Sequence, residues 1–331
     1  MKWLVTGGAG FVGSNLISSI LTERPQDQVV VLDNFSASAF DEFAVPPLEH
    51  AARLAPDAPV WDENRRLGVI EGDILDMDAV SRATAGADII VHLAANTGVG
   101  PSVDNPRRDS EMNVGGTLNM LEGARAAGVK RFVFASSGAP AGLCTPPITE
   151  TIAPRPVSPY GASKLAGEAY CCAYAVAFGV PTVALRFSNI YGPRSWRKGS
   201  VVATFIRQAM AGAPITVNGD GSQTRDFIHI DDLTRAIVLS ATTEGLSGEL
   251  YQIATGNETS VNELLALLED RFRAAGLPAI QRRQGERTAA DVERNFADPA
   301  KAARELGWRP QKDLAEGLGE TLDWFLRYQR G

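Results

Sequence analysis

Six short apolar runs alternate with helix-length segments in the first half of the chain, and this alternation limits the possible folds more than any other feature. The runs are KWLVTG, VVVLD, LGVIEGD, DIIVHLA, RFVFASS and TVALRFS. They are apolar at nearly every position, which is typical of parallel strands that are covered on both faces. Helical patterns lie between them, for example at residues 115–127 and 160–178. The sequence therefore predicts an α/β fold with a doubly wound parallel sheet.

The pattern changes after about residue 187 and predicts a smaller α/β C-terminal lobe. The stretch ITVNGDGSQTRDFIHI predicts a hairpin with a Gly-Asp-Gly turn, followed by a strand. The next residues, IDDL, predict a helix with Asp231 or Asp232 as its N-cap. The last seventy residues have mostly helical patterns, with Trp308 and Trp324 as expected core residues. Residues 34–68 are rich in Pro and Ala, and we expect one helix there, at residues 48–54.

These patterns suggest two coupled lobes without a flexible linker. We expect residues 1–186 to form the first domain and residues 187–331 to form the second, with residues 227–255 packing back on the first.

Charge and composition argue against several classes of function. The net charge is −7, and the densest basic group is only Arg194, Arg197 and Lys198, so neither nucleic acid nor a membrane surface is an expected partner. The chain opens on a strand, which leaves no room for a signal peptide, and no apolar run has the length of a membrane span. We therefore expect a cytoplasmic protein. Its three cysteines are expected to be buried thiols, and the three histidines show no metal-ligand spacing.

A glycine cluster follows the first apolar run. In VTGGAGFVGSNL, Gly7, Gly10 and Gly13 lie between that strand and the first helical pattern. Small residues at such a turn let the backbone approach a pyrophosphate, which the helix N-terminus stabilises. The sequence thus predicts a dinucleotide site in a Rossmann-type domain.

The second apolar run ends on Asp33, where a carboxylate can accept hydrogen bonds from the adenine ribose and repel a 2′-phosphate. The residues that follow are Asn34, Phe35 and Ser36, and no arginine stands among them, so NAD is predicted in preference to NADP. Asp73 in EGDIL either binds the adenine amino group or caps the end of its strand.

The stretch SPYGASK predicts the start of a helix that carries a catalytic pair. Ser158 is the expected N-cap, with Pro159 in the first turn. Lys164 lies four residues after Tyr160, on the same helix face. Its ammonium is expected to lower the pKa of Tyr160, which could then take a proton from a substrate hydroxyl group. A Tyr-x-x-x-Lys spacing is common by chance, but here it follows a dinucleotide motif and a strand that ends in serines.

The chain resembles the extended short-chain dehydrogenase/reductase family, the NAD-dependent nucleotide-sugar epimerases and dehydratases, and within it most the UDP-hexose 4-epimerases. The resemblance covers nearly the whole length and rests on TGGAGFVG, DNF, GDILD, HLAA, NVGGT, FASSGAPAG, YGASK, LRFSNIYGP and GDGSQTRDFIHIDDL. It implies a Rossmann lobe for NAD and a C-terminal lobe for the nucleotide sugar. The implied catalytic residues are Ser137, Tyr160 and Lys164.

The same resemblance implies the residues that contact each ligand. Those implied for NAD are Gly7, Gly10, Phe11, Val12, Gly13, Asp33, Asn34, Asp73, Ile74, Leu93, Ala94, Ala95, Ser136, Tyr160, Lys164 and Phe187. Ser136 is equally compatible with a purely structural hydroxyl. Those implied for the nucleotide sugar are Thr97, Ser137, Asn189, Val201, Ile215, Val217, Arg225, Arg287 and Asp291. Because RTAADV departs from the family pattern by one residue, the role of Arg287 stays open. Two roles are open for the basic residues Arg194, Arg197 and Lys198: they bind the carboxylate of an acidic sugar, or they form a solvated loop.

Two departures from the family pattern bear on the reaction. Pro140 and Ala141 replace a Val-Tyr pair, so a bulky side chain is missing near the expected sugar. Gly138 and Ala139 stand where the related dehydratases and decarboxylases carry acids. The resemblance therefore implies a UDP-sugar 4-epimerase that works through a transient 4-keto sugar, on a UDP-hexose or its uronic or N-acetyl derivative. A 4,6-dehydratase, a decarboxylase, a 4-keto reductase and a non-catalytic NAD-binding scaffold are the alternatives. Residues 118–127 and 160–178 are rich in Ala and Gly, and the resemblance implies that these helices form a homodimer interface. The alternative is that the small residues only pack the helices on the sheet.

Overall fold

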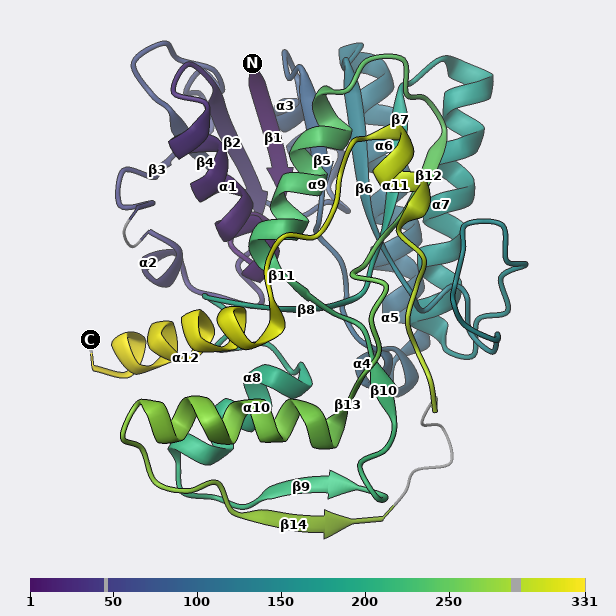
Figure 1. Cartoon of the computed structure of the whole chain (residues 1–331). Coiled ribbons are helices and arrows are strands. Elements are labelled where there is room, and N and C mark those ends of the chain that lie inside the picture. Colours follow the sequence, from purple (N-terminus) through teal and green to yellow (C-terminus); the bar gives the residue numbers. More distant parts are fainter. Residues whose placement is uncertain (45–46, 287–292, 331) are drawn as a thin grey trace. The chain divides into compact units, whose positions relative to one another are not determined.

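The computed structural model describes residues 1–44, 47–286 and 293–330 (Figure 1). Its helices are α1 (Phe11–Glu23), α2 (Phe40–Phe43), α3 (Met77–Thr84), α4 (Val99–Asp104), α5 (Pro106–Ser110), the π-helix η1 (Glu111–Gly115), α6 (Gly116–Ala127), α7 (Pro159–Phe178), α8 (Val201–Met210), α9 (Ile230–Thr242), α10 (Val261–Ala274), α11 (Ala300–Glu305) and α12 (Leu314–Arg330). Its strands are β1 (Lys2–Thr6), β2 (Gln28–Asp33), β3 (Ala52–Arg53), β4 (Leu67–Glu71), β5 (Ile89–His92), β6 (Arg131–Ser137), β7 (Thr182–Phe187), β8 (Asn189–Tyr191), β9 (Ile215–Asn218), β10 (Thr224–Arg225), β11 (Phe227–His229), β12 (Glu249–Ile253), β13 (Thr259–Ser260) and β14 (Arg282–Gly285).

Each of the six predicted apolar runs forms a strand of one large sheet. Its strand order among the described residues is β12-β7-β6-β5-β1-β2-β4-β3, and the pairings from β6 to β3 are parallel. Helices connect most of the successive strands, whereas β3 and β4 are joined by a segment without a helix. The predicted Rossmann-type α/β fold is confirmed.

The chain divides into two compact units, which are described separately. The first unit comprises residues 1–142, 152–186 and 234–251. The second comprises residues 143–151, 187–233 and 252–331.

Side chains on both faces of the sheet are buried in the first unit. Leu4, Val30 and Phe132 belong to a core cluster on the face that α3, α6 and α7 cover. Val31 points to the opposite face, where it lies beside Ile17 of α1. Two buried faces explain why the strands read as near-continuous apolar runs.

The second unit has its own core, which is built from helices and short strand pairs. α12 packs against α10, β8 and β11 (Figure 1). The centre of this core contains Leu264, Leu268, Leu318 and Phe325, each almost fully buried. Trp308 is also fully buried, as predicted, whereas Trp324 is only half-buried and stacks on Tyr328.

Two predicted elements are wrong. The hairpin expected after Ile215 does not form, because β9 pairs in parallel with the distant β14 and β10 pairs with β13. The turn itself is present, with positive φ at Gly219 and Gly221. Residues 48–54 hold no helix but the short strand β3, which extends the sheet beside β4.

The predicted N-cap of α9 is also wrong, because the helix begins at Ile230 and includes both aspartates in its first turn. The backbone N–H of Asp231 donates instead to Nδ1 of His229. Of the cysteines, Cys171 is buried, Cys144 is half-buried and Cys172 is exposed, so the expectation of buried thiols holds only for the first. Among the described residues, no helix is both long and apolar enough to cross a membrane.

Candidate active site

The turn between β1 and α1 is built from glycines in positions that a side chain would fill. Gly7 has a φ of 66°, and a Cβ there would lie 2.7 Å from the backbone nitrogen of Ala94. A Cβ on Gly13 would lie 2.5 Å from the carbonyl oxygen of Gly7. Gly10, the N-cap of α1, provides no side-chain cap to the first turn, which begins with Phe11 and Val12. The turn is therefore open to a pyrophosphate at the helix N-terminus, as the sequence predicts.

The end of β2 places three of the predicted cofactor residues together. The Asp33 carboxylate accepts the N–H groups of Ala9 at 2.9 Å and Phe35 at 2.8 Å. Burial raises the pKa of Asp33, against the effect of these two hydrogen bonds. Asn34 donates its side-chain amide to Asp73 at 2.9 Å. These acidic and amide groups offer acceptors and donors suited to the ribose and adenine of a dinucleotide.

The loop after β5 borders the same glycine turn. Leu93 and Ala94 lie within 3.0 Å of the Cβ position of Gly7, and the Ala94 N–H donates to Thr6 Oγ1 at 3.2 Å. Ala95 and Thr97 follow in this loop, and Ile74 lies against Gly116 of α6. All the sequence-predicted cofactor residues except Phe187 thus belong to the first unit.

The first turn of α7 has the predicted capping geometry. Ser158 is the N-cap and accepts the N–H of Gly161 at 3.1 Å, and Pro159 occupies the first turn. A Cβ on Gly161 would lie 2.7 Å from the carbonyl oxygen of Ala139, so this glycine lets the helix start close to the segment after β6. The Ser158 cap and the missing side chain at Gly161 therefore determine the position of Tyr160 in the first turn of α7.

The three expected catalytic residues lie close together in the first unit. Ser137 ends β6, and its hydroxyl is close enough to Tyr160 to act on the pKa of the phenol. The Lys164 ammonium is 5.9 Å from the centre of the Tyr160 ring and donates to the carbonyl oxygen of Ala135 at 2.9 Å. Lys164 is only 4% exposed, so it is a desolvated cation beside the tyrosine. This arrangement suits proton transfer at a hydroxyl group.

The expected lowering of the Tyr160 pKa is wrong for this arrangement. Burial raises the pKa of Tyr160, and the negative charge of Asp109 raises it further. The nearby hydroxyl of Ser137 acts in the opposite direction and lowers this pKa. Desolvation dominates because it penalises the charged form of a phenol in a buried position.

The hydroxyl of Ser136 is directed into a buried ion pair. It donates to Glu168, which also accepts two hydrogen bonds from Arg186, at 2.7 and 2.8 Å. Arg186 is 2% exposed and Glu168 8%. This geometry favours the structural alternative for Ser136. No local sequence pattern predicts the ion pair, whose partners lie 18 positions apart.

The predicted nucleotide-sugar residues fall mainly in the second unit. Asn189 lies in β8 and donates its amide to the carbonyl oxygen of Asp226 at 3.2 Å. Arg225 lies in β10 and donates to Thr224, and Val201 begins α8. Ile215 and Val217 lie in β9, the first fully buried in the core and the second 8% exposed. Arg287 and Asp291 lie outside the described residues.

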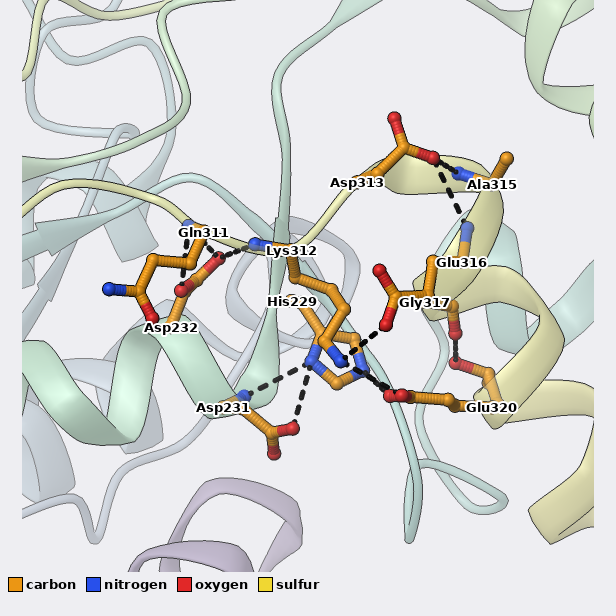
Figure 2. Close-up of polar contacts among 11 residues, drawn as sticks. His229, Asp231, Asp232, Gln311, Lys312, Asp313, Ala315, Glu316, Gly317 and Glu320 are labelled. Atoms are coloured by element: carbon orange, nitrogen blue, oxygen red, sulfur yellow. Dashed lines mark hydrogen bonds and ion pairs between the residues drawn. The ribbon is translucent and has the colours of Figure 1, made fainter.

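A second polar cluster lies at the start of α9 and α12, within the second unit (Figure 2). His229, Asp231 and Glu320 offer ligand atoms within 4.8 Å of one another. The two acids approach different ring nitrogens, however: Asp231 is 3.5 Å from Nδ1 and Glu320 is 3.6 Å from Nε2. The ammonium of Lys312 already binds Glu316 at 3.1 Å and Glu320 at 2.8 Å. The cluster is best described as a charge network that anchors α12.

Comparison with known proteins identifies the family. A sequence model of the NAD dependent epimerase/dehydratase family matches residues 3–254. The UDP-glucose 4-epimerase of Mycolicibacterium smegmatis is 34% identical over 330 residues, which cover 98% of each protein. The dTDP-glucose 4,6-dehydratase of Streptomyces antibioticus is 33% identical over 338 residues, which cover 98% of this chain and 92% of that protein.

Solved structures give the same result. The UDP-glucuronic acid 4-epimerase of Bacillus cereus, in complex with UDP-glucuronic acid and NAD, aligns with a TM-score of 0.87 and 30% identity, over 99% of this chain and 100% of that one. The chain belongs to the NAD dependent epimerase/dehydratase family, and NAD is its cofactor. The glycine turn and the acid at the end of β2 fit this cofactor.

Proposed function

We propose that this family member is a 4-epimerase that inverts C4 of a UDP-sugar. The observation that carries the proposal is the grouping of Ser137, Tyr160 and Lys164: the hydroxyl of Ser137 acts on the pKa of Tyr160, and the Lys164 ammonium lies 5.9 Å from the centre of the Tyr160 ring. The segment 138–141 that follows the serine contains no carboxyl group. Similarity to UDP-sugar 4-epimerases over almost the whole chain supports it.

The residues divide the chemistry between them. Tyr160 Oη accepts the proton of the C4 hydroxyl and later returns it, while Ser137 holds the same oxygen by a hydrogen bond. The positive charge of Lys164 favours the tyrosinate, against the burial that raises the pKa of Tyr160. Bound NAD supplies the acceptor, and then the donor, of the hydride at C4. The 4-keto sugar must turn over between the two transfers.

The absence of an acid beside Ser137 separates this proposal from dehydration. Removing water across C5 and C6 requires an acid for the leaving hydroxyl and a base for the C5 proton. In this segment Gly138 and Ala139 offer neither group. Because dTDP-glucose 4,6-dehydratases are also among the relatives, dehydration is the alternative that the experiment must test.

We assign the UDP moiety to the residues expected in the second unit. Arg225 and Asn189 would bind the diphosphate, since guanidinium and amide groups donate to phosphate oxygens. Val201 and β9 would border the base. Arg194 and Lys198 are half-buried and burial lowers the pKa of each, and we propose them as contacts of the carboxylate when the substrate is a uronic sugar.

We also propose a homodimer formed through α6 and α7. Tyr170 and Val176 are exposed on α7, at 37% and 84%, among small alanines. A second copy of the chain would cover this surface. Light scattering of the native protein should give twice the chain mass, and Ala173→Arg should give the mass of one chain. An unchanged mass in the variant would remove α7 from the interface.

The test of the reaction is an NMR time course with purified protein and no added NAD. UDP-glucose, UDP-N-acetylglucosamine and UDP-glucuronate are supplied in turn. We expect a C4-epimeric anomeric signal that reaches a constant ratio from either direction with one of them. Tyr160→Phe should abolish it, while Tyr170→Phe, an exposed tyrosine on the same helix, should not. A 4-keto-6-deoxy sugar or a pentose as the product would overturn the proposal.

A further inference from the structure

A fully buried carboxylate lies beside the catalytic helix. Asp109 of α5 is 0% exposed. Its Oδ2 accepts the hydroxyl of Ser163 at 2.7 Å, and its Oδ1 accepts the side-chain amides of Asn113 at 3.1 Å and Asn96 at 3.3 Å. Among the described residues, all of these hydrogen-bond donors are neutral. Burying an ionisable acid without a cation is unfavourable, so its presence needs an explanation.

The donors come from three segments that border the candidate active site. Asn96 precedes Thr97 in the loop after β5, Asn113 lies in η1, and Ser163 lies in α7 between Tyr160 and Lys164. Asn113 also exchanges hydrogen bonds with the backbone of Asn96, at 2.8 and 3.0 Å. Asp109 is therefore the common acceptor of a network that joins these segments.

The contact with α7 is the most direct of the three. Ser163 Oγ lies 2.7 Å from Asp109 and 3.1 Å from the carbonyl oxygen of Tyr160. A shift of this carboxylate would therefore move the helical turn that carries the catalytic tyrosine. The π-helix next to Asp109 supports this interpretation, because such wide turns occur frequently at functional sites.

We propose that Asp109 is a positioning residue, which holds the loop at Asn96, the turn at Asn113 and the first turns of α7 as one unit around Tyr160. The expected effect of Asp109 on turnover rests on the proposed function, whereas its structural role does not. It assigns Asp109 no contact with the sugar or the cofactor.

The negative charge of Asp109 also acts on Tyr160 directly. This effect is independent of the hydrogen bonds by which Asp109 holds α7. A nearby negative charge disfavours tyrosinate, and this charge raises the pKa of Tyr160. The other titratable groups nearby come from the elements packed around α5 and from β5. The exposed ones are Asp104, Arg107, Arg108 and Glu111, and the buried ones are Lys164 and His92.

Two substitutions distinguish the positioning role of Asp109 from the effect of its charge on Tyr160. Asp109→Asn keeps the shape and can still accept from both asparagines, while Ser163 can turn its hydroxyl fully to the Tyr160 carbonyl. We expect it to keep the kcat at high pH and to move the acid limb of the kcat/KM profile to lower pH. Ser163→Ala keeps the charge but loses the tie to α7. We expect a kcat at least tenfold lower, with the KM for the sugar nucleotide and the pH profile unchanged.

A spectroscopic titration makes the test independent of the substrate. The ultraviolet tyrosinate signal of Tyr160 is the difference between the chain and its Tyr160→Phe variant, and Asp109→Asn should move its midpoint downward. Asp104→Asn, on the neighbouring α4, is the matched control and should move nothing. If no UDP-sugar is converted, the proposed function fails while this titration still tests Asp109. An unchanged midpoint in Asp109→Asn together with an unchanged kcat in Ser163→Ala would overturn the inference.

Discussion

Gly167 of α7 lies so close to the ring of Phe134 in β6 that a Cβ on the glycine would stand 2.3 Å from Phe134 Cζ. Phe134 is 1% exposed, and the Lys164 ammonium lies 5.0 Å from the centre of the same ring. The missing side chain therefore lets the catalytic helix approach the strand that ends in Ser137. This contact sets the spacing between the serine and the Tyr-Lys pair.

Replacing Gly167 by Ala should destabilise the protein and slow its reaction. The buried ring has no room to move, and overpacking of a core typically costs about 1–3 kcal/mol. We expect a free energy of unfolding lower by about that amount in urea denaturation, and a lower kcat. Gly100→Ala in α4 is the control, because no atom lies within 4 Å of its Cβ position. Equal stability of the two variants would contradict the close contact.

Asp33 should determine the choice between NAD and NADP. Its carboxylate is held by the N–H groups of Ala9 and Phe35 at the end of β2. Asp33→Asn keeps this shape but removes the charge that repels a 2′-phosphate. We expect NAD affinity to fall and NADP affinity to rise, so that their ratio changes at least tenfold. Calorimetric titration of cofactor-free protein measures both constants, and an unchanged ratio would remove the role given to the charge.

Local patterns explain why much of the fold could be predicted. The six buried strands and the glycine turn are each defined by residues that are neighbours in sequence, and so is the Ser158 cap of α7. Their periodicity and composition reflect the environment in which they lie. The same is true of the Tyr160–Lys164 spacing, which one helix turn determines.

The errors share a different cause, which is partners far away in the chain. β9 looked like half of a hairpin because its neighbours in sequence form a turn, yet Thr216 pairs with Arg283 of β14. The short β3 is a strand only because β4 is beside it, with Ala52 opposite Gly68. No periodicity in residues 48–54 encodes that pairing.

The same limit applies to the candidate site. The direction of the Tyr160 pKa shift depends on burial and on Asp109, which is 51 positions away in the sequence and lies in a different helix. An acid and an asparagine four residues apart, at positions 109 and 113, were the available signal for the buried network. In the sequence alone, these two residues are typical of a solvent-exposed polar helix face.

Breaking the buried ion pair of Glu168 and Arg186 should be strongly destabilising. Arg186 Nε and one of its terminal nitrogens donate to Glu168, and both side chains are buried. Glu168→Gln leaves the guanidinium without its counter-charge, which typically costs about 3–5 kcal/mol in such a setting. Lys130→Met removes the more exposed pair with Asp88 and should cost less than about 1 kcal/mol. Urea denaturation of both variants tests the contrast, and similar losses would contradict it.

His92 should make the stability of the first unit fall at acid pH. Its side chain is 1% exposed, with Nδ1 2.7 Å from Thr6 Oγ1 and Nε2 3.2 Å from Thr117 Oγ1. The Thr117 hydroxyl donates to the carbonyl oxygen of Asn113, so it accepts from Nε2–H, and Nδ1 accepts from Thr6. Both nitrogens of the neutral ring are thus satisfied, and a second ring proton would have no acceptor in these contacts.

Burial, with a smaller effect from Lys164, lowers the pKa of His92 from 6.5 to about 3. Because the folded pKa lies below the unfolded one, the stabilisation is complete above pH 6.5 and is lost as the pH falls toward 3. The loss is about 1.4 kcal/mol per pH unit in that window. Urea denaturation at several pH values should therefore give a steeper fall for the wild type than for His92→Gln, which cannot titrate. Parallel curves would mean that the pKa of His92 is the same in the folded and the unfolded protein, which would contradict a buried neutral imidazole.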